Sequence, residues 1–211
     1  SGHQVIPEKI IALKPDLVVL QIDSAKSKSV RDSLTKLGIP VVMEKSASKI
    51  SDTYNEIELL GKVTDKSSKA KALTTSMKKR ITKILSESAK KEKYRFFHEL
   101  DNTLYSATSK TFIGNVYKDF GLINVADAAS STDSAGYPQL NAEYLIKSNP
   151  QIIFLADAQY GETSATVKAR QGWQGIEAVL NSKIVELPAD IPSRWGPRIV
   201  DFYEIVAKAI K

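Results

Sequence analysis

The sequence predicts an α/β protein of two lobes, in which mostly parallel sheets are flanked by helices and one long helix joins the lobes. Residues 67–91 contain no Gly and no Pro, and their apolar side chains recur every three or four positions, which is typical of a long amphipathic helix. On either side, short apolar runs of strand type alternate with helical segments, a pattern that favours parallel sheets. The apolar stripe of the long helix consists of Leu73, Met77, Ile81, Ile84 and Leu85.

The long helix divides the chain into three predicted parts. Residues 1–66 belong to the N-terminal lobe, residues 67–91 form the connecting helix, and residues 92–211 form the C-terminal lobe. A helix of this length spans roughly 35 Å, about the width of a small domain, and could therefore act as a rigid strut. A long surface helix of a single domain would show the same periodicity, so the sequence leaves that alternative open.

The N-terminal part alternates helices with strands. Pro7 suits the first turn of a short helix, and Gly38 and Gly61 are placed to end the second and third helices. The apolar runs between these helices are rich in Val, Ile and Leu, as in buried strands. The predicted order is helix 7–13, strand 17–22, helix 24–37, strand 39–43 and helix 51–60.

The C-terminal part repeats this alternation. Asn141 is expected to cap a helix that ends before Pro150. Residues 163–180 are expected to be largely helical despite Gly172 and Gly175. The other predicted elements are strand 94–99, helix 111–120, a short edge segment 123–127, strand 151–156, strand 184–187 and a final helix that starts at 197.

Composition narrows the classes of partner and chemistry. The 211 residues carry a formal net charge of +6 and contain no cysteine, which excludes disulfides, thiolate metal sites and cysteine nucleophiles. The lysines are scattered rather than clustered with arginine and aromatic residues, so we expect a solvated basic surface and no nucleic-acid partner. A basic module that binds nucleic acid or an anionic wall polymer is an alternative. No apolar run approaches the roughly 20 residues that span a bilayer.

Motifs of known catalytic chemistry are absent from the sequence, which has no GxSxG elbow, no GxxxxGK[ST] phosphate loop and no GxGxxG after a strand. The two histidines, His3 and His98, lack ligand spacing, so no metal site is predicted. An α/β-fold hydrolase or transferase that uses Glu99, Asp101 or Asp190 is an alternative function. Because the neighbouring residues supply neither a nucleophile nor an anion hole, we interpret these groups as solvated carboxylates and predict no enzyme.

Polar and aromatic side chains gather in the loops that follow predicted strands, where open α/β sheets bind ligands. Tyrosine and tryptophan offer large, rigid apolar surfaces with a polar tip, and arginine can pair with a carboxylate or phosphate of a ligand. Each residue alone could equally be ordinary loop packing, so their shared location carries the hypothesis. The predicted ligand-binding residues are Tyr105, Tyr137, Asp190, Arg194 and Trp195.

Several short motifs, taken in order, resemble the substrate-binding proteins of ABC importers for cobalamin, siderophores and haem, the class III periplasmic-binding-protein fold. Each motif is weak alone, but their order covers nearly the whole chain. They are PEKI followed by LKPDLV within 7–18, LGIPVV at 37–42, LYSA at 104–107, YPQLNAE at 137–143 and GPRIVD at 196–201.

The resemblance implies two lobes joined by one long helix, a metal chelate held between them, and no cofactor other than that cargo. It implies that Glu8 and Glu143, one on each lobe, dock on the membrane permease, and that the protein works outside the cytoplasmic membrane, in the periplasm or as a surface lipoprotein. The two glutamates also hold equivalent places in the sequence, since each precedes a proline-containing turn and an apolar strand.

Members of this family carry further residues before the segment that corresponds to Glu8, and those residues form the first strands of the N-terminal lobe. The resemblance therefore implies a lobe without its N-terminal part. Open strand edges and exposed apolar faces would then favour self-association.

Overall fold

The structure, a computed structural model, describes residues 6–22, 25–88, 93–129, 135–188 and 190–211. His3 and the last three residues of the predicted long helix, 89–91, lie outside these ranges. The contacts divide the chain into two compact units, residues 1–47 and 48–211. Because this division rests on contacts alone, the predicted lobe boundaries remain a prediction.

The smaller unit is a strand–helix–strand arrangement around a parallel pair. Its elements are α1 (Pro7–Ala12), β1 (Val18–Gln21), α2 (Ala25–Lys36) and β2 (Val41–Glu44). The strands are parallel, with Val18 opposite Val41 and Gln21 opposite Glu44. Val18, Val30 and Leu34 form the buried core, against which apolar residues of α1 and both strands pack. The predicted helices and strands of this part are confirmed, with bounds that shift by one to three residues.

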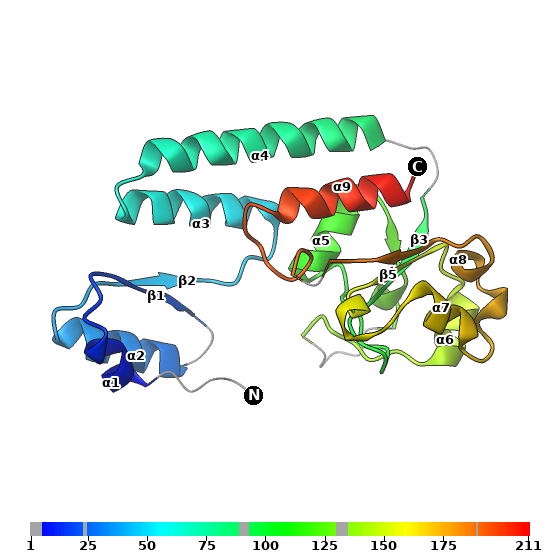
Figure 1. The fold of residues 1–211 in the computed structure, drawn as a ribbon, viewed down its shortest axis with the longest axis horizontal. Coiled ribbons are helices and arrows are strands. Elements are labelled where there is room, and N and C mark those ends of the chain that lie inside the picture. The colour runs from blue at the N-terminus through cyan, green and yellow to red at the C-terminus, as the bar shows by residue number, and fades with distance from the viewer. Residues whose placement is uncertain (1–5, 23–24, 89–92, 130–134, 189) are drawn as a thin grey trace. The chain divides into compact units, whose positions relative to one another are not determined.

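The larger unit begins with two helices packed along each other, α3 (Ile50–Val63) and α4 (Ser67–Ser88), as Figure 1 shows. Helix α4 also contacts the last helix, α9 (Ile199–Ala209). The long helix is thus confirmed, and Met77 and Ile81 of its predicted apolar stripe are buried. Leu73 is instead 39% exposed, and Ala70 and Thr74 are buried with Met77 and Ile81.

Gly61 has a different role from the predicted one. It lies inside α3, which continues to Val63, rather than at the end of the helix. A Cβ atom on Gly61 would stand 2.3 Å from the Cβ of Ala70 in α4. The glycine is therefore needed because two helix backbones approach each other closely at this point.

A four-stranded parallel sheet forms the body of the larger unit. Its strands lie in the order β4 (Ile123–Asn124), β3 (Arg95–Glu99), β5 (Ile152–Leu155) and β6 (Ile184–Glu186). All three pairings are parallel, and Phe96 lies opposite Ile152. The predicted α/β class with parallel sheets is confirmed, since both units contain a parallel sheet and helices.

Helices cover both faces of this sheet, because successive strand residues point to opposite sides. On one face, the rings of Phe96, Phe154 and Phe202 surround Tyr117, and helices α5 (Phe112–Asp119) and α9 contribute the partners. On the other face, Phe97 and Ile153 pack with the segments of α6 (Ala142–Ser148), α7 (Ser164–Ala169) and α8 (Glu177–Leu180). Figure 1 shows α5 and α9 on one side of the sheet and α6, α7 and α8 on the other.

The predicted long helix over 163–180 is wrong in part. Helix α7 ends at Ala169 because Arg170 is extended, and Gly172, with a positive φ of 82°, then leads the chain into a short 3₁₀ segment, η3 (Trp173–Gly175), before α8. The break places Trp173 in the core, where 2% of its surface is exposed. The interruption therefore serves packing, which the helical periodicity of this segment concealed.

No helix within the described ranges is long and apolar enough to cross a membrane.

Candidate functional site

Three loops leave the larger sheet at one edge, the carboxyl ends of its strands. The backbone N–H of Ala156 donates to the carbonyl of Glu99 at 2.9 Å, and that of Leu187 donates to the carbonyl of Leu155 at 2.9 Å. The loops that follow β3, β5 and β6 therefore begin side by side, in that order across the sheet. This edge is where parallel α/β sheets present loops to ligands, so we take it as the candidate site.

Tyr105 and Tyr137 are brought together, as predicted. Tyr105 forms an antiparallel bridge with Gln139, and the N–H of Ser106 donates to the carbonyl of Pro138 at 2.9 Å. The tyrosines are 40% and 42% exposed, so each side chain keeps part of its surface accessible to a ligand. Partial burial raises the pKa of Tyr137, which keeps its hydroxyl protonated near neutral pH. The pair thus offers two neutral aromatic surfaces with hydroxyl donors.

The loop after β6 carries the other predicted ligand residues, Asp190, Arg194 and Trp195. Arg194 donates from Nε to Oδ1 of Asp190 at 3.2 Å, and both side chains are more than half exposed. An exposed ion pair of this kind contributes little to stability. Arg194 can therefore release Asp190 and pair with a ligand anion at little cost in free energy. Trp195 packs its ring on Phe112, with 5.8 Å between the centroids. Trp195 therefore has a packing contact, and its role in ligand binding remains a prediction.

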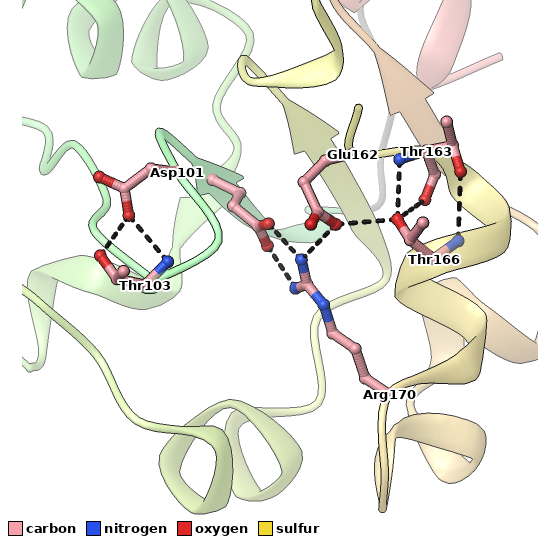
Figure 2. Close-up of polar contacts among 7 residues, drawn as sticks. Asp101, Thr103, Glu162, Thr163, Thr166 and Arg170 are labelled. Atoms are coloured by element: carbon pink, nitrogen blue, oxygen red, sulfur yellow. Dashed lines mark hydrogen bonds and ion pairs between the residues drawn. The ribbon is translucent and has the colours of Figure 1, made fainter. Parts of the chain in front are cut away.

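An ion network that the sequence did not reveal lies at the same edge (Figure 2). Arg170 donates through Nη1 and Nη2 to the two carboxylate oxygens of Glu99, at 2.6 and 2.5 Å, and Nη2 also donates to Glu162 at 2.8 Å. The guanidinium also lies over the ring of Trp173, 4.6 Å from its centroid. The network links the end of β3 to the loop after β5 and to α7.

Burial sets the protonation of this network. It raises the pKa of Glu99, which is fully buried, and the hydrogen bonds and charge of Arg170 offset part of that rise. For Arg170 itself, burial alone would lower the pKa, but hydrogen bonds and charges from Glu99 and Glu162 outweigh burial and raise it. Arg170 is thus permanently charged and is the group that makes a buried carboxylate at Glu99 tolerable.

The three carboxylates considered for catalysis are each engaged separately. Glu99 is paired with Arg170, Asp190 bonds Arg194, and Asp101 accepts from the N–H and hydroxyl of Thr103 at 2.9 and 2.5 Å. His98 is buried with Nδ1 2.8 Å from the hydroxyl of Tyr117, and burial lowers its pKa to about 3, so it is a neutral core residue. Within the described ranges, no group of three or more potential ligand side chains could hold a metal ion.

Asp157, in the loop after β5, is the most unusual group at this edge. It is 2% exposed, and among the described residues neither of its carboxylate oxygens has a hydrogen-bond partner in another residue. Its pKa is raised chiefly by burial, with a further rise from the charges of Glu162 and Asp101. Its own backbone amide and the charge of Arg170 act in the opposite direction. A buried carboxyl without a partner costs stability, so the position is not explained by packing.

Replacing Asp157 by Asn is therefore expected to stabilise the protein. Because the pKa of Asp157 is raised in the folded state, the wild type loses stability as the pH rises from the ordinary aspartate value through the raised one. At about pH 7 the variant should melt roughly 2–4 °C higher, as about 1 kcal/mol would produce in a protein of this size. Near pH 4 the difference should shrink, because a larger fraction of the wild-type group is then protonated.

Thermal melts followed by circular dichroism at both pH values test this expectation. Asp190→Asn is the matched control, since Asp190 is an exposed aspartate on the next loop and its replacement should shift the midpoint little at either pH. A lower midpoint for Asp157→Asn at neutral pH would contradict the assignment of Asp157 as a costly buried charge.

Glu8 and Glu143, the predicted docking residues, are both exposed and each lies in the first turn of a helix, α1 and α6 respectively. A carboxylate at this position is favoured by the helix dipole. The N-cap of α6 is Asn141, whose side chain accepts from the N–H of Tyr144 at 2.8 Å, so Glu143 projects from a well-fixed turn. The structure leaves both carboxylates accessible, and their docking role remains a prediction.

Comparison with known proteins identifies the same family that the sequence motifs resemble. Residues 1–191 match the profile of the family described as periplasmic binding protein. The ABC transporter substrate-binding lipoprotein YvrC of Bacillus subtilis is 31% identical over 96% of this chain and 64% of its own length. A vitamin B12-binding protein of Vibrio parahaemolyticus is 25% identical over 95% of this chain and 70% of its own length. The chain thus spans about two thirds of the length of these relatives.

Solved structures agree with the sequence comparisons. A possible iron-binding, periplasmic solute-binding protein from Staphylococcus epidermidis superposes with a TM-score of 0.78 at 27% identity, over 98% of this chain and 80% of the other. A periplasmic heme-binding protein, BhuT, has the same TM-score at 16% identity over 98% and 80% of the two chains, which supports the fold alone. The resemblance inferred from the sequence motifs is confirmed, and the chain belongs to the periplasmic binding protein family.

Proposed function

We propose that this chain is the solute-binding component of an ABC importer and that its cargo is a metal chelate of the cobalamin, ferric siderophore or haem type. The observation that supports the proposal is the carboxyl edge of the larger sheet in a member of this family, where the segments of Tyr105 and Tyr137 are bridged and Arg194 follows β6 at the same edge. Relatives named for vitamin B12 and for Fe(3+)-citrate support this class of cargo.

The site residues fit such a cargo chemically. The two half-exposed tyrosine rings can cover an apolar face of a macrocycle or siderophore, and their hydroxyls can donate to its oxygens. Arg194 can pair with a propionate, citrate or phosphate group after releasing Asp190. The metal enters as part of the cargo, so the protein needs no cofactor of its own. Nothing in this arrangement requires a catalytic step, and the proposal is a receptor rather than an enzyme.

Delivery would use Glu8 and Glu143. The proposal places the protein outside the cytoplasmic membrane, in the periplasm or held at the cell surface by a lipid anchor, in line with the lipoprotein relative from Bacillus subtilis. The two exposed glutamates would bind basic pockets of the permease, one from each unit. Ligand binding and docking would then depend on different residues, which allows the two steps to be tested separately.

Titration with cyanocobalamin, haemin and ferric citrate, followed by tryptophan fluorescence, tests the cargo. Trp195 lies on the loop that carries Arg194, so binding there should change its emission, whereas Trp173 is buried in the core. We expect a saturable change with one of the three compounds and a roughly tenfold or greater loss of affinity when Tyr105 and Tyr137 are both replaced by Ala.

The matched control is Leu180→Ala. Leu180 is 66% exposed and ends α8 just before β6, at the opposite edge of the sheet. Its replacement should leave the titration unchanged. An unchanged emission with all three compounds, or equal affinities for the double tyrosine variant and the wild type, would contradict the proposed site.

A further inference from the structure

The order of the strands places an unassigned loop in the middle of the candidate site. Strand β5 lies between β3 and β6, so the loop 156–163 leaves the sheet between the loop of Tyr105 and the loop of Arg194. A ligand that touched both outer loops would pass over the middle one. The sequence could not show this, because strand order is not readable from local patterns.

Tyr160 is the exposed aromatic residue of this middle loop. It ends the 3₁₀ turn η2 (Ala158–Tyr160), and 82% of its surface is exposed, about twice the fraction of Tyr105 or Tyr137. The turn is closed by the N–H of Tyr160, which donates to the carbonyl of Asp157 at 2.8 Å, and by that of Gly161, which donates to Ala158 at 3.2 Å. Gly161 has a positive φ of 100°, which turns the chain back toward α7.

The segment that follows Tyr160 is fixed by hydrogen bonds to neighbouring elements. Glu162 accepts from Arg170, which is itself held by Glu99, and Glu162 also accepts from the hydroxyl of Thr166 at 2.8 Å, as Figure 2 shows. The N–H of Ser164 donates to Glu186 in β6 at 2.9 Å. The loop is therefore fixed to β3, to α7 and to β6, so the base of Tyr160 does not depend on a ligand for its position.

Asp157, at the start of the same loop, adds a second observation. Among the described residues its buried carboxyl has no hydrogen-bond partner in another residue, although an apolar residue of similar size would pack there without that cost. Groups that lower stability without a packing role are typical of functional sites. The same loop thus holds both a buried carboxyl that lowers stability and an exposed aromatic ring.

We propose that Tyr160 is a further ligand-contacting residue, which stacks its ring on the apolar or planar face of the bound chelate. This rests on the proposed function, since it assigns a residue of the same site. An aromatic ring whose backbone is already fixed by hydrogen bonds can stack on a flat ligand surface with little loss of the protein's conformational entropy. Single exposed aromatic residues are common on protein surfaces, but Tyr160 combines exposure with a fixed backbone at the centre of the ligand-facing edge.

Affinity measurements on three variants test this inference. With whichever of cyanocobalamin, haemin or ferric citrate binds the wild type, Tyr160→Ala should weaken binding about tenfold, and Tyr160→Phe should retain most of the affinity, since the ring carries the contact. Leu180→Ala, which removes an exposed side chain at the opposite edge, should bind as the wild type does. Because Tyr160 is exposed, all variants should melt at the wild-type temperature.

Each outcome has a separate meaning. Wild-type affinity in Tyr160→Ala would overturn the inference and leave the proposed function intact. Equal losses in Tyr160→Ala and Leu180→Ala would also overturn it, since the effect would not be specific to the middle loop. If the wild type binds none of the three compounds, the proposed function fails and the inference fails with it.

Discussion

Replacing Arg170 by Ala is expected to destabilise the protein by about 3–5 kcal/mol, the usual cost of leaving a buried carboxylate without its partner. Glu99 is fully buried, and both of its carboxylate oxygens accept from Arg170. The variant would therefore leave the negative charge of Glu99 buried at the end of β3 without a positive partner. The melting temperature should fall by roughly 10 °C. The loss should be largest near neutral pH and smaller in acid, because protonated Glu99 no longer needs a cation.

Two further variants make this expectation specific to the buried charge. Adding Glu99→Gln to Arg170→Ala should recover part of the loss, since a neutral amide is less costly to bury than a carboxylate. Arg80→Ala is the control, because Arg80 also contacts two acidic residues, Asp201 and Glu204, but with side chains about half exposed. Its effect should stay within about 1 kcal/mol. Equal destabilisation by Arg80→Ala and Arg170→Ala would contradict the burial argument.

Reversing the charge of Glu8 and Glu143 together, to Lys at both positions, is expected to abolish uptake of the chelate while leaving its binding affinity unchanged. Both carboxylates are exposed, and neither belongs to the proposed ligand-binding residues; Glu8 lies in the first turn of α1 and Glu143 in the first turn of α6. Like charges facing basic permease pockets would oppose docking by several kcal/mol. Transport of labelled chelate in cells, together with affinity measured on the purified protein, checks both halves of this expectation.

The control must carry the same change of charge elsewhere. Asp32→Lys with Glu87→Lys also adds four positive charges, one substitution in each unit, at side chains more than half exposed. Uptake should continue with this control. If the control blocks uptake as fully as the test variant, or if the test variant loses ligand affinity, the docking role of Glu8 and Glu143 is refuted.

Local patterns were sufficient for most of the fold. Periodicity found the long helix α4, and alternation of apolar runs with helical segments indicated parallel sheets, which both units contain. These signals are local, since they depend on spacings of two and of three to four residues. The burial of Ala70 and Thr74 in α4 and the role of Gly61 were missed because both depend on the packing of α3 against α4, which no single helix reveals.

The candidate site was predictable only in part. Loop aromatics after strands pointed to Tyr105 and Tyr137, and the structure brings their segments together through the bridge at Gln139. The partners Glu99 and Arg170 are 71 residues apart in the sequence, so no local motif joins them. The burial of Asp157 likewise arises only from tertiary packing. Tyr160 could have been found from the rule that ligands bind at the ends of parallel strands, once the strand order was known.

The most direct test of the account is equilibrium dialysis of the purified protein against cyanocobalamin, haemin and ferric citrate, with the bound chelate measured by absorbance or metal content. A receptor of the proposed kind should retain one of these compounds at a single saturable site, and the variant that lacks the rings of Tyr105, Tyr137 and Tyr160 should release it. Retention of none of the three, or undiminished retention by the triple variant, would contradict a chelate receptor built on the carboxyl edge of this sheet.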